Sequence, residues 1–301
     1  AGNVISPEEI LKNFGSDILR VWVTASDYSE DLRIDKTILN QHAESYRKIR
    51  NTFRFILGNI QDNFQKIDIE NLNIKELPEL ERYILHKIFI LDLNYKENLK
   101  NYNFHKLYKE LLNFCTLDLS SFYFDIRKDV LYCDNINSKK RKNCITVLNI
   151  LLDSLLKWFA PILVFTTEEI YNLVEKSDSS IHETQFPKLK PEFRDDTLAE
   201  KWKNIYKIKQ EANIAIEEKR SIKEIGSSLE AEIEILTNDE NYRLLEKLDL
   251  PEYFITSKAK LSKNPADTKE TIIKVKKTNG EKCPRCWKIL ETKCSRCVEF
   301  L

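Results

Sequence analysis

The chain has 301 residues, of which 42% are hydrophobic and 32% are charged. Its 48 lysines and arginines balance 48 aspartates and glutamates, so the overall charge does not indicate a nucleic-acid partner, and such a partner has to be sought in local patches. This length allows about two domains, and the charged fraction favours long, solvated helices. The longest apolar run, 145–164, is interrupted by polar residues, so we expect no membrane contact.

Helical patterns dominate the first part of the chain. Ser6 is expected to cap a first helix that opens at Pro7, and Gly15 to end it before a second helix starts. Asp35 is expected to cap a long helix over about 35–62, whose apolar stripe follows helical spacing at Ile49, Phe53, Ile56, Leu57 and Ile60.

The opposite side of helix 35–62 carries a polar, basic stripe made of Arg47, Arg50, Asn51 and Arg54. No acid lies between residues 46 and 54, so we expect no acidic partner for these arginines on the same helix. The pattern is equally compatible with a phosphate-binding surface and with an ordinary solvated face.

Further amphipathic helices are predicted near 77–99, 104–125 and 139–158, and another opens at Thr167. Together these helices predict an antiparallel helical bundle, with Phe122, Tyr123 and Phe124 in its core. A linker is expected at 177–197 and a charged helix at 198–220. A small α/β junction follows, with strands at 231–236, 252–256 and 271–276 and a short helix at 239–248. The predicted fold class is therefore mainly α, with domains at 1–180, 181–270 and 271–301.

Four of the seven cysteines form two C-x-x-C pairs near the C-terminus, at Cys283, Cys286, Cys294 and Cys297. Two such pairs separated by seven residues can direct four thiolates at one ion, which predicts a closed structural Zn²⁺ site without catalysis at the metal. A disulfide staple or a chance pattern is the alternative. The three other cysteines read as reduced thiols, which favours a cytoplasmic protein; they are Cys115, Cys133 and Cys144.

Charge is concentrated around this predicted metal site. Between residues 257 and 293, eleven basic residues face four acids, a net charge of +7, of which four thiolates on Zn²⁺ would remove two. Such a patch is typical of polyanion binding, with Trp287 available for base stacking and Arg296 for bidentate contacts. The candidate RNA contacts here are Lys282, Arg285, Trp287 and Arg296. Alternatively, Trp287 covers the metal and the lysines are simply solvated.

Residues of the usual catalytic motifs are not found. The five glycines are scattered and form no phosphate-binding loop, and no serine or cysteine has the local signature of a nucleophile. We therefore predict no catalytic residue in this chain. It contains no methionine and begins at Ala1, from which we expect a piece of a longer protein.

Several stretches resemble class I aminoacyl-tRNA synthetases for branched aliphatic amino acids. Those stretches are Gly2-Asn3-Val4-Ile5-Ser6-Pro7, Gly15-Ser16-Asp17-Ile18-Leu19-Arg20-Val21-Trp22, Asp27-Tyr28-Ser29-Glu30-Asp31, Tyr46-Arg47-Lys48-Ile49-Arg50-Asn51-Thr52-Phe53-Arg54-Phe55 and Trp158-Phe159-Ala160-Pro161-Ile162-Leu163. Two further features narrow the resemblance to bacterial isoleucyl-tRNA synthetases, namely the Cys₄ tail and Gly226-Ser227-Ser228-Leu229-Glu230-Ala231.

This resemblance implies that the whole protein activates isoleucine with ATP and esterifies it to tRNA(Ile). In the family, a Lys-Met-Ser-Lys-Ser loop immediately precedes the Gly-Asn that is Gly2-Asn3 here. The catalytic domain, where ATP binds, and the editing domain would therefore lie upstream. The chain is expected to bind the anticodon arm, to pack on the catalytic domain, and to act as a monomer in the cytoplasm. The alternatives are the equivalent part of a valyl-tRNA synthetase and a free-standing zinc-ribbon adaptor that binds protein.

Overall fold

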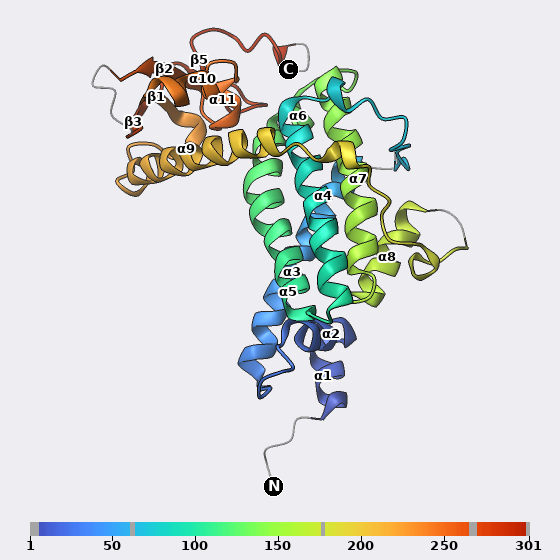
Figure 1. Cartoon of the computed structure of the whole chain (residues 1–301). Helices are drawn as coiled ribbons and strands as arrows, with labels where there is room; N and C mark the ends of the chain where they lie inside the picture. Colours follow the sequence, from blue (N-terminus) through green and yellow to red (C-terminus); the bar gives the residue numbers. More distant parts are fainter. Residues whose placement is uncertain (1–5, 61–63, 176–177, 265–269, 299–301) are drawn as a thin grey trace. The chain divides into compact units, whose positions relative to one another are not determined.

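The structure, a computed structural model, describes residues 6–60, 64–175, 178–264 and 270–298 (Figure 1). Residues 2–5 of the resembling stretch, the linker residue Ser177 and the charged Asp267 and Lys269 lie outside these ranges. Two compact units are present: Ala1–Tyr123 with Lys142–Arg194, and Phe124–Arg141 with Asp195–Leu301. The division into functional domains at 180 and 270 stays a prediction. No helix in the described ranges combines the length and apolarity needed to cross a membrane.

The first unit begins with two short helices, α1 (Pro7–Phe14) and α2 (Ser16–Ala25). The Ser6 hydroxyl accepts a hydrogen bond from the Glu9 N–H at 3.3 Å, and Gly15 separates the helices at φ 85°, a conformation that favours glycine. Helix α3 spans Lys36–Ile60 and is capped by Asp35, whose Oδ1 accepts from the Ile38 N–H at 2.8 Å. These predicted caps are confirmed.

The bundle of the first unit is completed by α4 (Glu79–Lys100), α5 (Phe104–Asn113), the π-helix η2 (Phe114–Tyr123), α7 (Lys139–Phe159) and α8 (Val164–Val174). Figure 1 shows α3, α4, α5 and α7 as roughly aligned helices. The Phe53 ring packs edge-on against Phe159, and the earlier Tyr46 reaches the later Thr166. The chain from α7 into α8 therefore runs antiparallel to α3, as predicted for the bundle.

One predicted helix is longer and less regular than expected. The segment predicted at 104–125 is helical from Phe104 to Cys133, because α5 continues through the π-helical turns of η2 into α6 (Phe124–Cys133). Phe122, Tyr123 and Phe124 are each at most 2% exposed, so the prediction that they belong to the core is confirmed.

The second unit combines α6 and the long helix α9 (Asp196–Ser221) with a three-stranded sheet. The central strand β1 (Ala231–Thr237) pairs parallel with β2 (Lys258–Lys263) and antiparallel with β3 (Ile272–Lys277). Between β1 and β2 lie α10 (Asp239–Leu245) and α11 (Leu250–Tyr253). The C-terminal part forms a hairpin of β4 (Glu281–Lys282) and β5 (Ile289–Leu290).

Short 3₁₀ turns occur in both units. The first unit has them at Ile74–Glu76, Ile181–Glu183 and Pro191–Phe193, and the second unit at Ser228–Glu230.

The strand predicted at 252–256 is wrong, because this segment opens with the helical turn α11 and β2 starts only at Lys258. Asp249 caps the turn by accepting a hydrogen bond from the Glu252 N–H at 3.4 Å. Pro251 is the second residue of α11. A capping acid followed by proline favours a helix start, and here this local signal overrides the β propensity of Tyr253 and Phe254.

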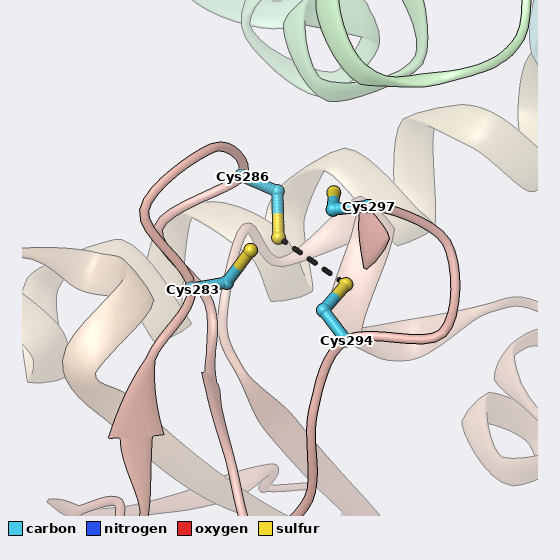
Figure 2. Close-up of side chains that lie close together, drawn as sticks. All are labelled: Cys283, Cys286, Cys294 and Cys297. Atoms are coloured by element: carbon cyan, nitrogen blue, oxygen red, sulfur yellow. Dashed lines mark hydrogen bonds between the residues drawn. The ribbon is translucent and has the colours of Figure 1, made fainter. Parts of the chain in front are cut away.

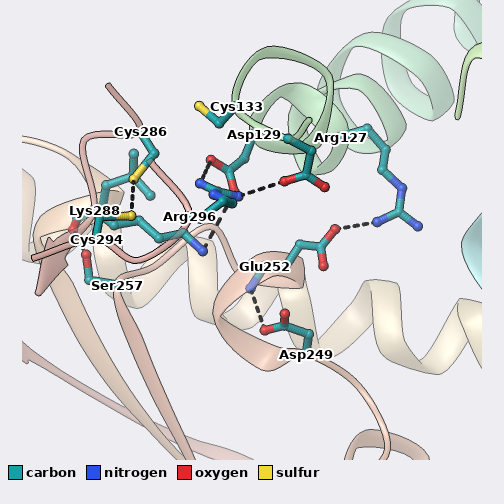
Figure 3. A network of polar contacts seen from close by, with 12 residues as sticks. Arg127, Asp129, Cys133, Asp249, Glu252, Ser257, Cys286, Lys288, Cys294 and Arg296 are labelled. Carbon is teal, nitrogen blue, oxygen red and sulfur yellow. Dashed lines mark hydrogen bonds and ion pairs between the residues drawn. The ribbon is translucent and has the colours of Figure 1, made fainter. Parts of the chain in front are cut away.

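A buried ion cluster joins α6 to α11 within the second unit (Figure 3). The Arg127 guanidinium, fully buried, donates to Glu252, and Lys140 donates to the other oxygen of the same carboxylate. The Arg127 guanidinium also lies 5.7 Å from the centre of the Tyr253 ring. Two cations, from α6 and α7, meet at this one buried carboxylate, so Glu252 is the anion that joins α6 to α11 in the cluster.

Replacing Glu252 by Gln is therefore expected to lower the free energy of unfolding by about 3 kcal/mol, the usual cost of breaking a buried ion pair from one side. Urea unfolding followed by tryptophan fluorescence measures this loss. Glu240→Gln, an exposed change on α10, is the control and is expected to leave the unfolding midpoint unchanged. Equal midpoints for the two variants would contradict the structural role of the cluster.

Candidate metal centre and nucleic-acid interface

The two C-x-x-C pairs form two tight turns at the end of the second unit (Figure 2). In the first turn, the Cys283 N–H donates to the Lys288 carbonyl and the Trp287 N–H to the Cys283 carbonyl, both at 2.9 Å. Gly280 allows the hairpin to close at φ 135°, because a Cβ there would lie 2.4 Å from the Leu290 carbonyl oxygen. In the second turn, the Cys297 N–H donates to the Cys294 carbonyl at 3.1 Å.

These turns bring all four predicted cysteine sulfurs within 4.8 Å of one another. A tetrahedral ion with metal–sulfur bonds of about 2.3 Å requires sulfurs about 3.8 Å apart, and the Cys286 and Cys294 sulfurs lie 3.9 Å apart. All seven cysteines are free, so the four form no disulfide staple. The donor set fits one metal ion with four soft ligands.

The backbone of the first turn favours the thiolate of Cys283. Burial alone would raise the pKa of Cys283, but hydrogen bonds from the backbone N–H groups of Cys286 and Arg285 lower that pKa to about 7. A metal binds the deprotonated sulfur, so this turn prepares a ligand near neutral pH.

Arg296, predicted as an RNA contact, is held by acids of the second unit (Figure 3). Its Nη1 and Nη2 donate to the two Asp129 oxygens at 2.6 and 2.7 Å, and Nη1 also lies 3.2 Å from Asp134 Oδ1. Hydrogen bonding to Asp129, with further contributions from the Cys286 and Cys297 thiols, raises the pKa of Arg296. Arg296 is therefore a cation that joins the second cysteine turn to α6 beside the cysteine sulfurs, and its contact with RNA stays a prediction.

The sequence did not indicate three residues at this site, namely Asp129 and Cys133 of α6 and Asp134 just beyond the end of the helix. Cys133 packs in one buried cluster with the metal-site cysteines, and its sulfur lies 3.9 Å from the Arg285 carbonyl oxygen. More than 140 residues separate them from the tail, and no short motif links them. Only tertiary packing brings them together.

Beside the cysteine turns the structure gathers the other three RNA candidates of the tail. Trp287 is 60% exposed, the Lys282 ammonium lies 5.7 Å from the centre of its ring, and Arg285 Nη2 donates to the Tyr132 carbonyl at 3.3 Å. A cavity of about 330 Å³ opens next to them, and its largely apolar lining includes Trp287, Tyr132, Ile126, Leu229, Pro251 and Ile255. We call Lys282, Arg285, Trp287 and this cavity the tail rim.

The charge excess counted along the tail is partly offset in three dimensions. Acids of β1 and α10, which lie outside the counted segment, pair with its lysines: Lys260 and Lys274 with Glu234, Lys276 with Glu232, and Lys263 with Asp239. The sheet is therefore less positive than the sequence count suggests, and the tail rim is the better candidate for polyanion contact.

The polar stripe of α3 lies in the first unit. Arg47, Arg50, Asn51 and Arg54 are all exposed, while Ile49, Phe53 and Ile56 are at most 1% exposed on the buried side. The expectation of no acidic partner on the same helix is wrong for Arg47, because Glu44, one turn earlier, pairs with it. Arg50 bonds the Tyr46 hydroxyl at 3.3 Å and lies 3.9 Å from Glu169. Such exposed pairs are weak and can be exchanged for phosphate.

The family model for the anticodon-binding domain of tRNA ligases matches residues 81–235. The chain belongs to this family of anticodon-binding domains of tRNA ligases.

Isoleucine–tRNA ligases are among its relatives. That of Pelagibacter ubique (strain HTCC1062) is 59% identical over 295 residues, covering 98% of this chain and 32% of the relative. The Natranaerobius thermophilus enzyme is 37% identical over 322 residues, covering 100% of this chain and 35% of the relative. The Gluconobacter oxydans (strain 621H) enzyme is 38% identical over 309 residues, covering 100% of this chain and 32% of the relative. The chain thus spans about a third of the length of these relatives.

Replacing Arg296 by Ala is expected to weaken Zn²⁺ binding about 10- to 100-fold, the usual effect of removing a group that supports the ligands. Competition with a chromogenic chelator measures the change. Arg243→Ala removes an arginine of the same unit that is 77% exposed and is expected to leave the affinity unchanged. Unchanged affinity in Arg296→Ala would show that this guanidinium does not support the thiolates.

Proposed function

We propose that this chain is the C-terminal, tRNA-binding part of an isoleucine–tRNA ligase and that it holds the anticodon arm of tRNA(Ile). The observation that carries the proposal is the similarity of 98% of the chain to such a ligase at 59% identity, together with the anticodon-binding family match. The whole protein would activate isoleucine with ATP and transfer it to the tRNA. This chain would contribute by positioning the tRNA, since correct placement of a distant reacting end is a large part of catalysis.

Two surfaces support RNA binding by different physical means. The α3 stripe offers guanidinium groups, which suit contact with backbone phosphates and make affinity salt-dependent. The tail rim offers an exposed indole, two cations and an apolar cavity, which suit an unstacked base of a single-stranded loop. An anticodon arm presents both features, a charged stem and a loop with accessible bases.

The proposed metal is one structural Zn²⁺ on Cys283, Cys286, Cys294 and Cys297. A closed four-thiolate site supplies folding energy to a short segment and no reaction. The ion would hold the two cysteine turns together and so fix the backbone that presents Trp287. We place the chain, as part of a cytoplasmic monomer, against the catalytic domain of the same protein.

The purified, zinc-loaded chain is expected to bind tRNA(Ile) more tightly than tRNA(Val) or other tRNAs. Binding is expected to weaken when a chelator removes the metal and when salt is raised from 50 to about 200 mM. Filter binding or fluorescence anisotropy against a tRNA panel measures all three effects. A preference for tRNA(Val) would favour the valyl relative. Failure of a folded, zinc-loaded chain to bind any tRNA would contradict the proposal and favour a protein-binding adaptor.

Trp287→Ala is expected to weaken tRNA(Ile) binding about tenfold, within the range for losing one base-stacking platform. Tyr102→Ala is a matched control, because both aromatic residues are exposed, Tyr102 to 66% and Trp287 to 60%. Both also have a positive φ, 58° for Tyr102 and 64° for Trp287. The control is expected to bind normally. Equal affinity of the Trp287 variant and wild type, with zinc retained, would remove the tail rim from the interface.

A further inference from the structure

Arg50 lies at the end of a hydrogen-bonded series that crosses three helices of the first unit. Asp17 of α2, only 8% exposed, accepts from the Thr166 hydroxyl at 2.6 Å. The Thr166 oxygen lies 2.9 Å from the Tyr46 hydroxyl, and Arg50 Nη1 donates to that hydroxyl at 3.3 Å. Arg50 itself is exposed, with 55% of its side chain accessible.

The direction of every bond in this series follows from its first member. A carboxylate can only accept, so Thr166 must spend its single hydroxyl proton on Asp17. The Thr166 oxygen is then left with lone pairs alone, and Tyr46 has to donate to it. The Tyr46 oxygen is in turn left to accept, and a guanidinium, which only donates, is the partner that suits it.

The inner end of the series is firmly anchored. The Asp17 carboxylate also accepts from the backbone N–H groups of Phe165 and Thr166, at 3.3 and 2.9 Å, in the first turn of α8. Anions are favoured at this end of a helix, so Asp17 joins α2 to α8 and holds the Thr166 hydroxyl in place. The outer end is loose, since the only ion pair described for Arg50 is the 3.9 Å approach to exposed Glu169.

We propose that Asp17, Thr166 and Tyr46 form a positioning relay that holds the Arg50 guanidinium in place for an RNA backbone phosphate. The inference rests on the proposed tRNA-binding function and adds to it a residue, Tyr46, that touches no RNA itself. An arginine whose Nη1 is already held loses less rotational freedom on binding, and such preorganisation increases affinity. The relay leaves Nη2 and Nε free to meet the phosphate once Glu169 is displaced.

The test is a double-mutant cycle on the 301-residue chain with a tRNA(Ile) transcript as probe. Tyr46→Phe removes only the hydroxyl and is expected to weaken binding about three- to tenfold. Arg50→Ala is expected to weaken it further and to lower the slope of log affinity against log salt by about one. In the Arg50→Ala background, Tyr46→Phe is expected to have no further effect.

Two controls separate positioning from folding. Tyr171→Phe removes another tyrosine hydroxyl of the same unit, one that bonds Ser179 at 3.3 Å, and is expected to leave affinity unchanged. Thr166→Ser keeps the relaying hydroxyl and is expected to bind like wild type. Thermal melting of each variant verifies the fold. If Tyr46→Phe melts early, Thr166→Ser takes its place in the test, and a strong loss of affinity in Thr166→Ser would overturn the relay.

The remaining outcomes are distinct. If Arg50→Ala weakens binding but Tyr46→Phe does not, or if their effects simply add, the relay is overturned while the tRNA-binding function stands. If neither change matters in a chain that binds tRNA(Ile), Arg50 is not a contact and the relay is again overturned. A wild-type chain that binds no tRNA overturns the proposed function itself.

Discussion

Four thiols held within 4.8 Å of one another are the constraint around which the second unit is arranged. Deprotonated sulfurs at this spacing repel one another strongly unless cations stand beside them, and a metal alone leaves a four-thiolate site with net negative charge. Arg296 supplies such a cation beside Cys286 and Cys297, whose thiols help to raise its pKa, and it is itself held by Asp129. Charge balance and anchoring of the tail are thus achieved by one guanidinium.

Helix α6 is where these interactions converge. Within about two turns it contributes Arg127 to the ion cluster with α11, Asp129 to Arg296, and Cys133 to the buried surface of the cysteine turns. A single helix therefore supports both the α/β part and the metal centre. This explains why residues 124–141 belong to the same compact unit as the tail, although they interrupt the bundle along the chain.

The two candidate RNA surfaces differ in how they are held. On α3, arginines extend from a rigid helix, and a buried carboxylate orders one of them through two hydroxyl groups. On the tail rim, Trp287 stands on a turn at φ 64°, and its position depends on how the cysteine sulfurs are held. Salt should therefore affect the first surface most, and metal removal the second.

The sequence alone was sufficient wherever a signal is local. Helix caps at Ser6 and Asp35, the break at Gly15, the apolar stripe of α3 and the spacing of the four cysteines depend on neighbours a few residues away, and the structure contains each of them. The strand predicted at 252–256 is wrong because the prediction followed the β propensity of this segment. It did not use the equally local and stronger helix signal, the Asp249 cap followed by Pro251.

Only the tertiary structure decided which charges are available. From the sequence, the Arg296 guanidinium is expected to be available for bidentate contacts, yet acids more than 160 positions earlier hold it. The lysines of the sheet likewise form ion pairs with acids of the neighbouring strand and helix. Coulomb interactions act through space over a few ångströms. Separation along the sequence does not tell which distant acid will lie beside a given basic residue. The positions of basic residues were readable from the sequence, whereas their freedom to bind a partner depended on the fold.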